Sequence, residues 1–205
     1  MQKLFFQSLY IVQMKSVEII GFKRANLGKK DSKAARLEGN VPCVMYGGKE
    51  QHHFSVPYLL FRDLVYTPEA KMVDLNIEGT TFKCILQDMQ FNPYNDAITH
   101  ADFLELDENK PVRMDIPVKF SGTSPGVAKG GKLTVLMPKL KVEALPKDMP
   151  DFVEVDITEI DLGKSVKVNA IKGDKYRILN PGSNPVASVV VPRALRGKAG
   201  AEETK

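Results

Sequence analysis

Residues 22–48 read FKRANLGKKDSKAARLEGNVPCVMYGG, and this segment carries the most specific chemistry of the chain, which the rest supports. Its two anions, Asp31 and Glu38, face six cations, namely Lys23, Arg24, Lys29, Lys30, Lys33 and Arg36. The local excess of four positive charges equals the formal net charge of +4 of the whole chain. A cationic segment that ends at a Tyr-Gly-Gly corner suits a polyanion such as a nucleic acid, although an ordinary solvated helix and loop would also explain the charge.

The centre of this segment predicts a short helix. Asp31 or Ser32 is a suitable N-cap for a helix over residues 33–37, and Gly39 is placed to end it. On such a helix, side chains three and four residues apart share one face. The cations at these intervals are Lys29, Lys33 and Arg36.

Short strands are predicted on both sides of this helix. Gly47-Gly48 suits a tight hairpin turn, and Pro57 suits the first turn of a short amphipathic helix. Apolar and polar residues alternate, or form short apolar runs, over residues 16–22, 41–46, 53–56, 72–78, 82–90 and 98–106. These strands, with two or three short helices, predict an antiparallel β-barrel domain over residues 14–106.

A second all-β domain is predicted beyond this barrel. Residues 107–111, DENKP, are polar and end in a proline, which makes them the predicted linker. Strand-like segments separated by Gly and Pro then recur over residues 112–120, 133–137, 140–145, 152–157, 165–171, 177–179 and 186–191. The fold class is therefore mainly β, with an all-β C-terminal domain over residues 112–193, either a sandwich or a barrel.

The two ends of the chain lie outside these predicted domains. Residues 1–13 resemble a stunted signal peptide without a cleavage site. We expect them to be an over-extended gene start or a disordered leader, with Met14 as the initiator. Residues 194–205 have little apolar surface to bury, which predicts a disordered tail.

The composition is that of a soluble globular protein. Of the 205 residues, 43% are hydrophobic and 26% are charged, and the mean hydropathy is -0.20. No apolar run approaches the roughly 20 residues that a membrane-spanning helix needs. Cys43 and Cys84 lie far apart in apolar, strand-like surroundings, which predicts reduced core thiols in the cytosol and no zinc site.

Two motifs raise the question of catalysis. Residues 126–133, GVAKGGKL, match the start of a phosphate-binding loop, but Leu133 replaces the Ser or Thr that meets magnesium. We expect a glycine-rich surface loop there. His100 and Asp102 share one face of a strand, yet no third ligand or nucleophile accompanies them.

The polar residues of the first half suit recognition of a nucleic acid instead. The imidazole of His100 and the carboxylate of Asp102 can hydrogen-bond base edges or sugar hydroxyls. Gln87 and Gln90 each present an amide donor and acceptor, and Tyr46 can stack or donate to a phosphate. Satisfied polar side chains on a strand surface, and a half-buried tyrosine, are the simpler alternative.

Taken together, these residues resemble the bacterial large-subunit ribosomal protein family numbered twenty-five, in its long form, also called general stress protein CTC. The resemblance runs from Met14 to about Pro192. The motifs that carry it are Lys23-Arg24, Gly28-Lys29, Ser32-Lys33 with Arg36, the VPCVMYGG run at 41–48, Gln87-Asp88 with Gln90 and Pro93, and His100-Ala-Asp102-Phe103.

This resemblance implies that the first domain binds 5S ribosomal RNA, at a helical region whose minor groove is widened by non-Watson-Crick pairs. The residues that it implies on the RNA backbone and groove wall are Arg24, Lys29, Ser32, Lys33, Arg36 and Tyr46. Those that it implies on the barrel face that reads the RNA are Gln87, Gln90, His100 and Asp102.

The sequence therefore predicts a structural constituent of the large ribosomal subunit, in the cytoplasm, that is not an enzyme. Its expected partners are 5S ribosomal RNA and, through the second domain, neighbouring ribosomal proteins or ribosomal RNA. No cofactor, metal ion, membrane or small-molecule substrate is expected. A stress-responsive protein-binding module without a stable RNA partner is the alternative, and an enzyme that uses His100 and Asp102 ranks below both.

Overall fold

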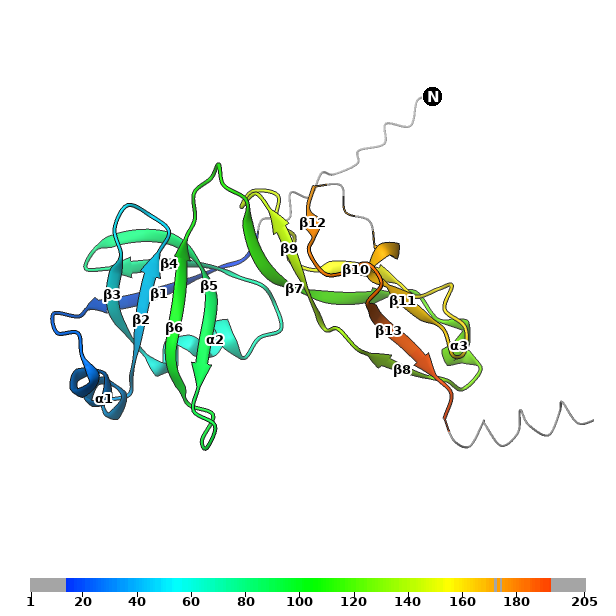
Figure 1. Cartoon of the computed structure of the whole chain (residues 1–205), viewed down its shortest axis with the longest axis horizontal. Coiled ribbons are helices and arrows are strands. Elements are labelled where there is room, and N and C mark those ends of the chain that lie inside the picture. The colour runs from blue at the N-terminus through cyan, green and yellow to red at the C-terminus, as the bar shows by residue number, and fades with distance from the viewer. Residues whose placement is uncertain (1–13, 172, 174, 193–205) are drawn as a thin grey trace, which may run out of the picture.

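The computed structural model describes residues 14–171, 173 and 175–192. The leader predicted at 1–13 and the tail predicted at 194–205 lie outside the described residues. The described chain is mainly β, as predicted, and forms a closed barrel followed by two smaller sheets (Figure 1). None of the helices in this part of the chain is long and apolar enough to cross a membrane.

A six-stranded barrel forms the first half of the described chain (Figure 1). Around the barrel the strands follow the order β1-β3-β2-β6-β5-β4. They are β1 (Ser16–Lys23), β2 (Asn40–Tyr46), β3 (His52–Pro57), β4 (Met72–Ile77), β5 (Thr80–Phe91) and β6 (Ile98–Glu105). The six predicted strands are confirmed, with ends that differ from the prediction by at most two residues.

The barrel is mainly antiparallel, but two of its strand pairs are parallel. Four ladders run antiparallel, whereas β1 with β4 and β2 with β6 run parallel. In the second of these pairs, Val44 lies beside Asp102 and Tyr46 beside Leu104. Parallel partners are far apart in sequence and carry no hairpin signal, so the sequence does not reveal them.

Inward-pointing apolar side chains fill the barrel. The buried residues that alternate along β4 are Val73, Leu75 and Ile77. Phe54 and Phe103 are fully buried, and their ring centroids lie 5.7 Å apart. The short helices η1 (Tyr58–Phe61) and α2 (Arg62–Val65) add further apolar side chains to this core, where the sequence predicts a helix after Pro57.

Helix α1 (Lys29–Leu37) starts four residues before the predicted position. Its N-cap residue is Gly28 and no side chain caps it, so the predicted caps at Asp31 and Ser32 are wrong. The predicted end is confirmed, because Gly39 follows the last turn with a φ of +80°. The early start adds a full turn of basic sequence to the helix.

Two small sheets form the second half of the described chain. One has the strand order β10-β7-β9-β12, and the other has the order β11-β13-β8. The strands are β7 (Val112–Ser121), β8 (Lys132–Val135), β9 (Lys139–Ala144), β10 (Val153–Asp156), β11 (Ser165–Lys167), β12 (Arg177–Ile178) and β13 (Pro185–Val190), with the short helices α3 (Pro125–Ala128) and η2 (Val168–Ala170). Each predicted strand segment overlaps one of these strands. The limits of the two domains and the linker at 107–111 stay predictions.

The barrel and the second half bury side chains against each other. Ile85 lies on β5 between two residues that pack inside the barrel, yet it is only 2% exposed. It packs outside the barrel, in a core cluster that contains Val112 and Val142 of the second half. We call this contact the seam. The buried first-half residues in it are Met14, Ala70 and Ile85.

Candidate nucleic-acid interface

The cations of α1 lie on the protein surface. Lys29 and Lys33 are exposed, and in the described part of the chain neither ammonium group has a hydrogen bond or an ion pair. Arg36 is also exposed, but its Nε donates to the backbone oxygen of Thr99 in β6 at 2.9 Å. This bond ties the end of α1 to the barrel and leaves the outer guanidinium nitrogens able to bind an anion.

A second bond holds the first turn of α1. Arg24, just after β1, donates from Nη2 to the hydroxyl of Ser32 at 3.2 Å. The backbone N–H of Arg24 in turn donates to the carbonyl of His53 in β3 at 3.1 Å. Two of the predicted contact residues are therefore paired with each other, and the Ser32 hydroxyl can still donate its proton to a phosphate oxygen.

Polar side chains gather where β5 and β6 pair on the outside of the barrel. His100 lies opposite Gln90, and Asp102 lies opposite Asp88. The Nδ1 atom of His100 is 2.7 Å from Oδ1 of Asp102, and each side chain is 31% exposed. Apart from that imidazole, Oδ1 has no polar partner among the described residues. The two side chains are thus both positioned and accessible, as recognition of a ligand requires.

Tyr46 lies at the end of β2, beside this polar group. Burial raises the pKa of its phenol, and the carboxylates of Asp102 and Asp88 raise it further. The phenol therefore keeps its proton at neutral pH and remains a hydrogen-bond donor. The structure thus brings Tyr46 close to the carboxylates at the centre of the candidate interface.

Gln87 lies apart from this group. The register of β5 against β6 shifts between Leu86 and Asp88, which places Gln87 in a β-bulge. Gln87 lines a cavity of about 540 Å³ between the barrel and the second half, together with Lys139 and Lys141 of β9. A simple alternation along the strand does not predict this bulge, so sequence spacing alone misplaces Gln87.

Charge divides the candidate interface into two parts. The exposed face of α1 carries Lys29, Lys33 and Arg36, whereas the strands beside it carry the carboxylates of Asp88 and Asp102. Cations attract phosphates, and carboxylates accept hydrogen bonds from base amino groups and ribose hydroxyls. The arrangement therefore suits a polynucleotide whose backbone meets the helix and whose groove meets the strands.

A groove beside α1 was missed by the sequence reasoning. It has a volume of about 470 Å³ and lies between the end of α1 and the turn that joins β5 to β6. Leu37 at its edge is 81% exposed, and Asn92 and Asn95 line its far side. The only sequence signal for it is an apolar residue at the end of an otherwise polar helix.

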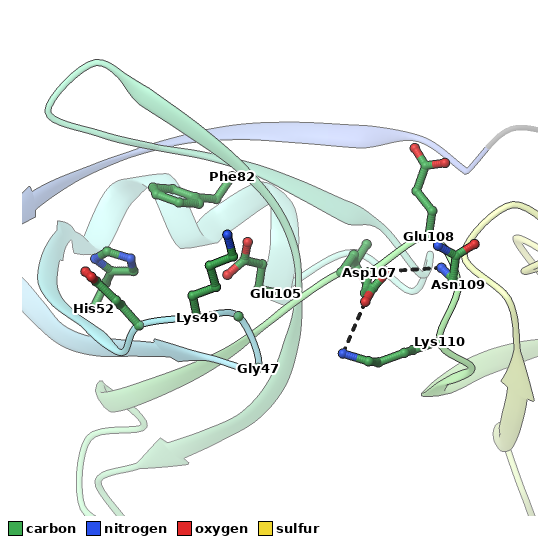
Figure 2. A pocket seen from close by; sticks show the side chains of 12 residues that line it. Gly47, Lys49, His52, Phe82, Glu105, Asp107, Glu108, Asn109 and Lys110 are labelled. Atoms are coloured by element: carbon green, nitrogen blue, oxygen red, sulfur yellow. Dashed lines mark hydrogen bonds and ion pairs between the residues drawn. The ribbon is translucent and has the colours of Figure 1, made fainter.

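A larger cavity lies at the opposite end of the barrel and is acidic. It has a volume of about 790 Å³ and lies beside the loop after β2 and the segment after β6. Its carboxylates are Glu50, Glu105, Asp107 and Glu108, against the ammonium groups of Lys49 and Lys110. Figure 2 shows Lys49 beside Glu105, and Asp107 bonded to Lys110 at 3.1 Å. This excess of negative charge opposes phosphate binding, so the acidic cavity is a poorer candidate for a nucleic-acid interface than the surface around α1.

The glycine-rich segment after β7 lies at the surface, as the sequence predicts, with residues 127–130 exposed, but it is a short helix and turn with one buried glycine and not an open loop. Residues 125–128 form α3, and Gly126 is buried. Every backbone N–H from residue 126 to residue 131 donates to a carbonyl oxygen of the protein. No N–H group remains there to hold a phosphate, and a side chain at Gly126 would come within 2.7 Å of the backbone of Asp161. Within the described residues, no three His, Cys, Asp or Glu side chains could hold a metal ion.

Two family models match most of this chain. The model described as "Ribosomal L25p family" matches residues 19–103, which span α1 and all but the outer ends of β1 and β6 in the barrel. The model described as "Ribosomal protein TL5, C-terminal domain" matches residues 111–193. The two matches cover the two halves of the described structure in the same order.

Bacterial relatives match along nearly their whole length. The chain is 55% identical over 192 residues to the large ribosomal subunit protein bL25 of Cytophaga hutchinsonii, covering 94% of this chain and 100% of the relative. It is 51% identical to that of Amoebophilus asiaticus, with 94% and 98% covered. It is 44% identical to that of Phocaeicola vulgatus, with 91% and 98% covered. This protein therefore belongs to the bL25 family of large ribosomal subunit proteins, a non-enzymatic family whose members are constituents of the bacterial ribosome in the cytoplasm.

Proposed function

We propose that this protein binds 5S ribosomal RNA through the barrel and α1. The exposed cations of α1 hold phosphates, and the polar side chains of β5 and β6 contact the groove between the RNA strands. The resemblance described above implies this RNA partner. Because sequence-independent charge contacts position a protein and a few polar contacts specify its site, both parts of the interface are needed.

The bond from Arg36 to the carbonyl of Thr99 is the observation that supports the proposal most strongly. It joins α1 to β6 one residue before His100, so that the cationic face and the polar strand face form one surface. Gln90, opposite His100, and Tyr46, near Asp102, extend this surface across the neighbouring strands. A folded RNA needs such a rigid arrangement, because it is recognised by shape as well as by charge.

The second half is proposed to make a separate contact inside the subunit. We propose that it forms its own domain after residues 107–111 and touches a neighbouring ribosomal protein or ribosomal RNA. Exposed lysines on its strands or beside them support an RNA contact. They are Lys139, Lys141, Lys164 and Lys167.

Charge reversal on α1 tests the proposal. Lys29→Glu with Lys33→Glu changes two exposed side chains that have no bonding partner in the described structure, whereas a change at Arg36 would also break its bond to Thr99. We expect the double variant to lose affinity for a 5S ribosomal RNA transcript by on the order of tenfold or more, since phosphate contacts dominate such binding. Filter binding at fixed salt measures this loss.

A matched double variant controls for net charge. Lys83→Glu with Lys132→Glu reverses two exposed lysines that lie away from α1, on β5 and β8. It should bind the transcript nearly as well as the wild type does. Equal affinities for the wild type and the α1 variant would contradict the proposal and favour the protein-binding module.

A further inference from the structure

We propose that the groove beside α1 receives one unstacked nucleobase of the bound ribosomal RNA. This inference rests on the proposed function and adds a specific contact to it. The groove adjoins the cationic helix directly, because Lys33 and Arg36 form one of its edges. An RNA held by those two side chains would therefore pass along the mouth of the groove.

The lining of the groove suits a neutral, flat, polar-edged ligand. Its apolar walls include Leu37, Val41, Ala97 and Ile98. Among the described residues that line it there is no carboxylate, whereas the acidic cavity at the opposite end of the barrel has four. A nucleobase has apolar faces and hydrogen-bonding edges, and its attached phosphates are anionic. The two cations at the edge match those phosphates.

Two side-chain amides provide directional contacts on the far side of the groove. The Oδ1 atom of Asn92 accepts the backbone N–H of Tyr94 at 3.0 Å, and Oδ1 of Asn95 accepts that of Ala97 at 3.2 Å. Their carbonyl ends are thus occupied in holding the turn. The NH₂ groups are left to donate to the carbonyl oxygens or ring nitrogens of a base.

Two exposed apolar side chains lie at the groove or on the turn beside it. Leu37 is 81% exposed at its edge, and Tyr94 is 96% exposed on the turn that carries Asn92 and Asn95. Single exposed apolar side chains are common on protein surfaces, but Leu37 also lines a groove whose other walls include apolar side chains. A base that enters the groove would cover Leu37, and the neighbouring base could stack on the Tyr94 ring.

The occupant is inferred to be RNA and not a peptide, for reasons of charge and position. The groove is continuous with α1, whose exposed face is cationic, and the bond from Arg36 to Thr99 spans from the helix to β6 beside it. An apolar peptide would satisfy the walls but would leave Lys33 and Arg36 without anionic partners. A nucleotide satisfies the walls, the amides and the cations together.

A base-removal experiment with the full-length protein tests this inference. The probe is a pool of 5S ribosomal RNA molecules in which each molecule lacks one base, sorted into bound and free fractions and sequenced. For the wild type, removal of one particular base should weaken binding on the order of 5- to 150-fold, the range expected for one stacked base. Ala97→Phe, which fills the groove, should weaken binding of intact RNA by a similar factor and should be insensitive to removal of that same base.

Two further variants keep the test clear. Leu37→Ala shortens an exposed side chain without disturbing the core. In this variant, removal of that base should weaken RNA binding less than it does in the wild type. Leu136→Ala, a change at a leucine that is 49% exposed in the second half, should behave as the wild type. The groove proposal alone is overturned if the wild type binds intact RNA but every base removal weakens binding equally in the wild type, Ala97→Phe and Leu37→Ala. Failure of the wild type to bind intact RNA would overturn the proposed function as well.

Discussion

Replacing Ile85 with Ala tests whether the two halves of the protein stabilise each other. Ile85 lies on a barrel strand, but its side chain packs outside the barrel, in the seam with Val112 and Val142. If the barrel were an independent unit, this side chain would be exposed and its truncation would cost little. Its 2% exposure predicts a real cost instead.

The size of that cost follows from burial. Truncating a buried Ile to Ala removes about 2 to 5 kcal/mol from the free energy of unfolding, with the largest losses where the cavity cannot collapse. Because the seam lies between sheets and not inside one of them, we expect neighbouring side chains to close part of the cavity that this truncation leaves. We therefore expect a loss near the lower end, about 2 to 3 kcal/mol.

Urea unfolding followed by far-UV circular dichroism measures the change. Ile20→Ala is the matched control, because Ile20 is a barrel residue that is 51% exposed, and it should change the free energy of unfolding by about 0.5 kcal/mol or less. The affinity of Ile85→Ala for 5S ribosomal RNA should remain that of the wild type, since α1 and the groove do not touch the seam.

Equal stabilities for Ile85→Ala and Ile20→Ala would refute this reasoning. Such a result would mean that the seam opens readily in solution and that the burial of Ile85 contributes nothing to folding. The seam and the RNA-binding surface would also not have separate roles if Ile85→Ala lost more binding free energy for the RNA than free energy of unfolding.

The remaining predictions concern charge and the thiols. Lys29→Ala with Lys33→Ala should lower the slope of log affinity against log salt by roughly 1.4 to 1.8, the loss of two phosphate contacts, and an unchanged slope would place these lysines off the RNA. Burial raises the pKa of Cys84 to about 12 and also raises that of Cys43, with carboxylates adding to both. Because the folded pKa lies above the unfolded value of about 8.5, this contribution to stability is complete below pH 8.5 and is lost as pH rises toward 12. Unfolding curves from pH 8 to pH 11 should show the loss, and fast alkylation of the folded protein at pH 8 would contradict the burial of both thiols.

Local patterns in the sequence predict the strands well. The alternation of Val73, Leu75 and Ile77 has one structural solution, a strand with one buried face, and the structure has that strand. Gly39 also ends α1 as predicted, because glycine readily adopts the left-handed backbone that follows the helix. Such features depend on neighbours in sequence, which a single chain reveals.

Features that depend on distant partners are not predictable in this way. Ser32 resembles a helix cap, but its hydroxyl accepts a bond from Arg24, which lies in the connection between β1 and α1. Gln87 follows the strand pattern, but the register against β6 places it in a bulge. The groove combines Leu37 with Asn92 and Asn95, more than fifty residues apart, so only the folded barrel brings them together.

The seam also has a mechanical consequence for the assembled particle. Two domains joined only by a flexible linker can each bind while the distance between their partners varies. Domains that share a buried contact instead favour one relative orientation. Once the barrel end is attached, the far sheets are presented at a defined position, and their local concentration near a second partner is correspondingly high. The change Ile85→Ala would then weaken binding of the second half to its partner, although no residue of the second half is changed.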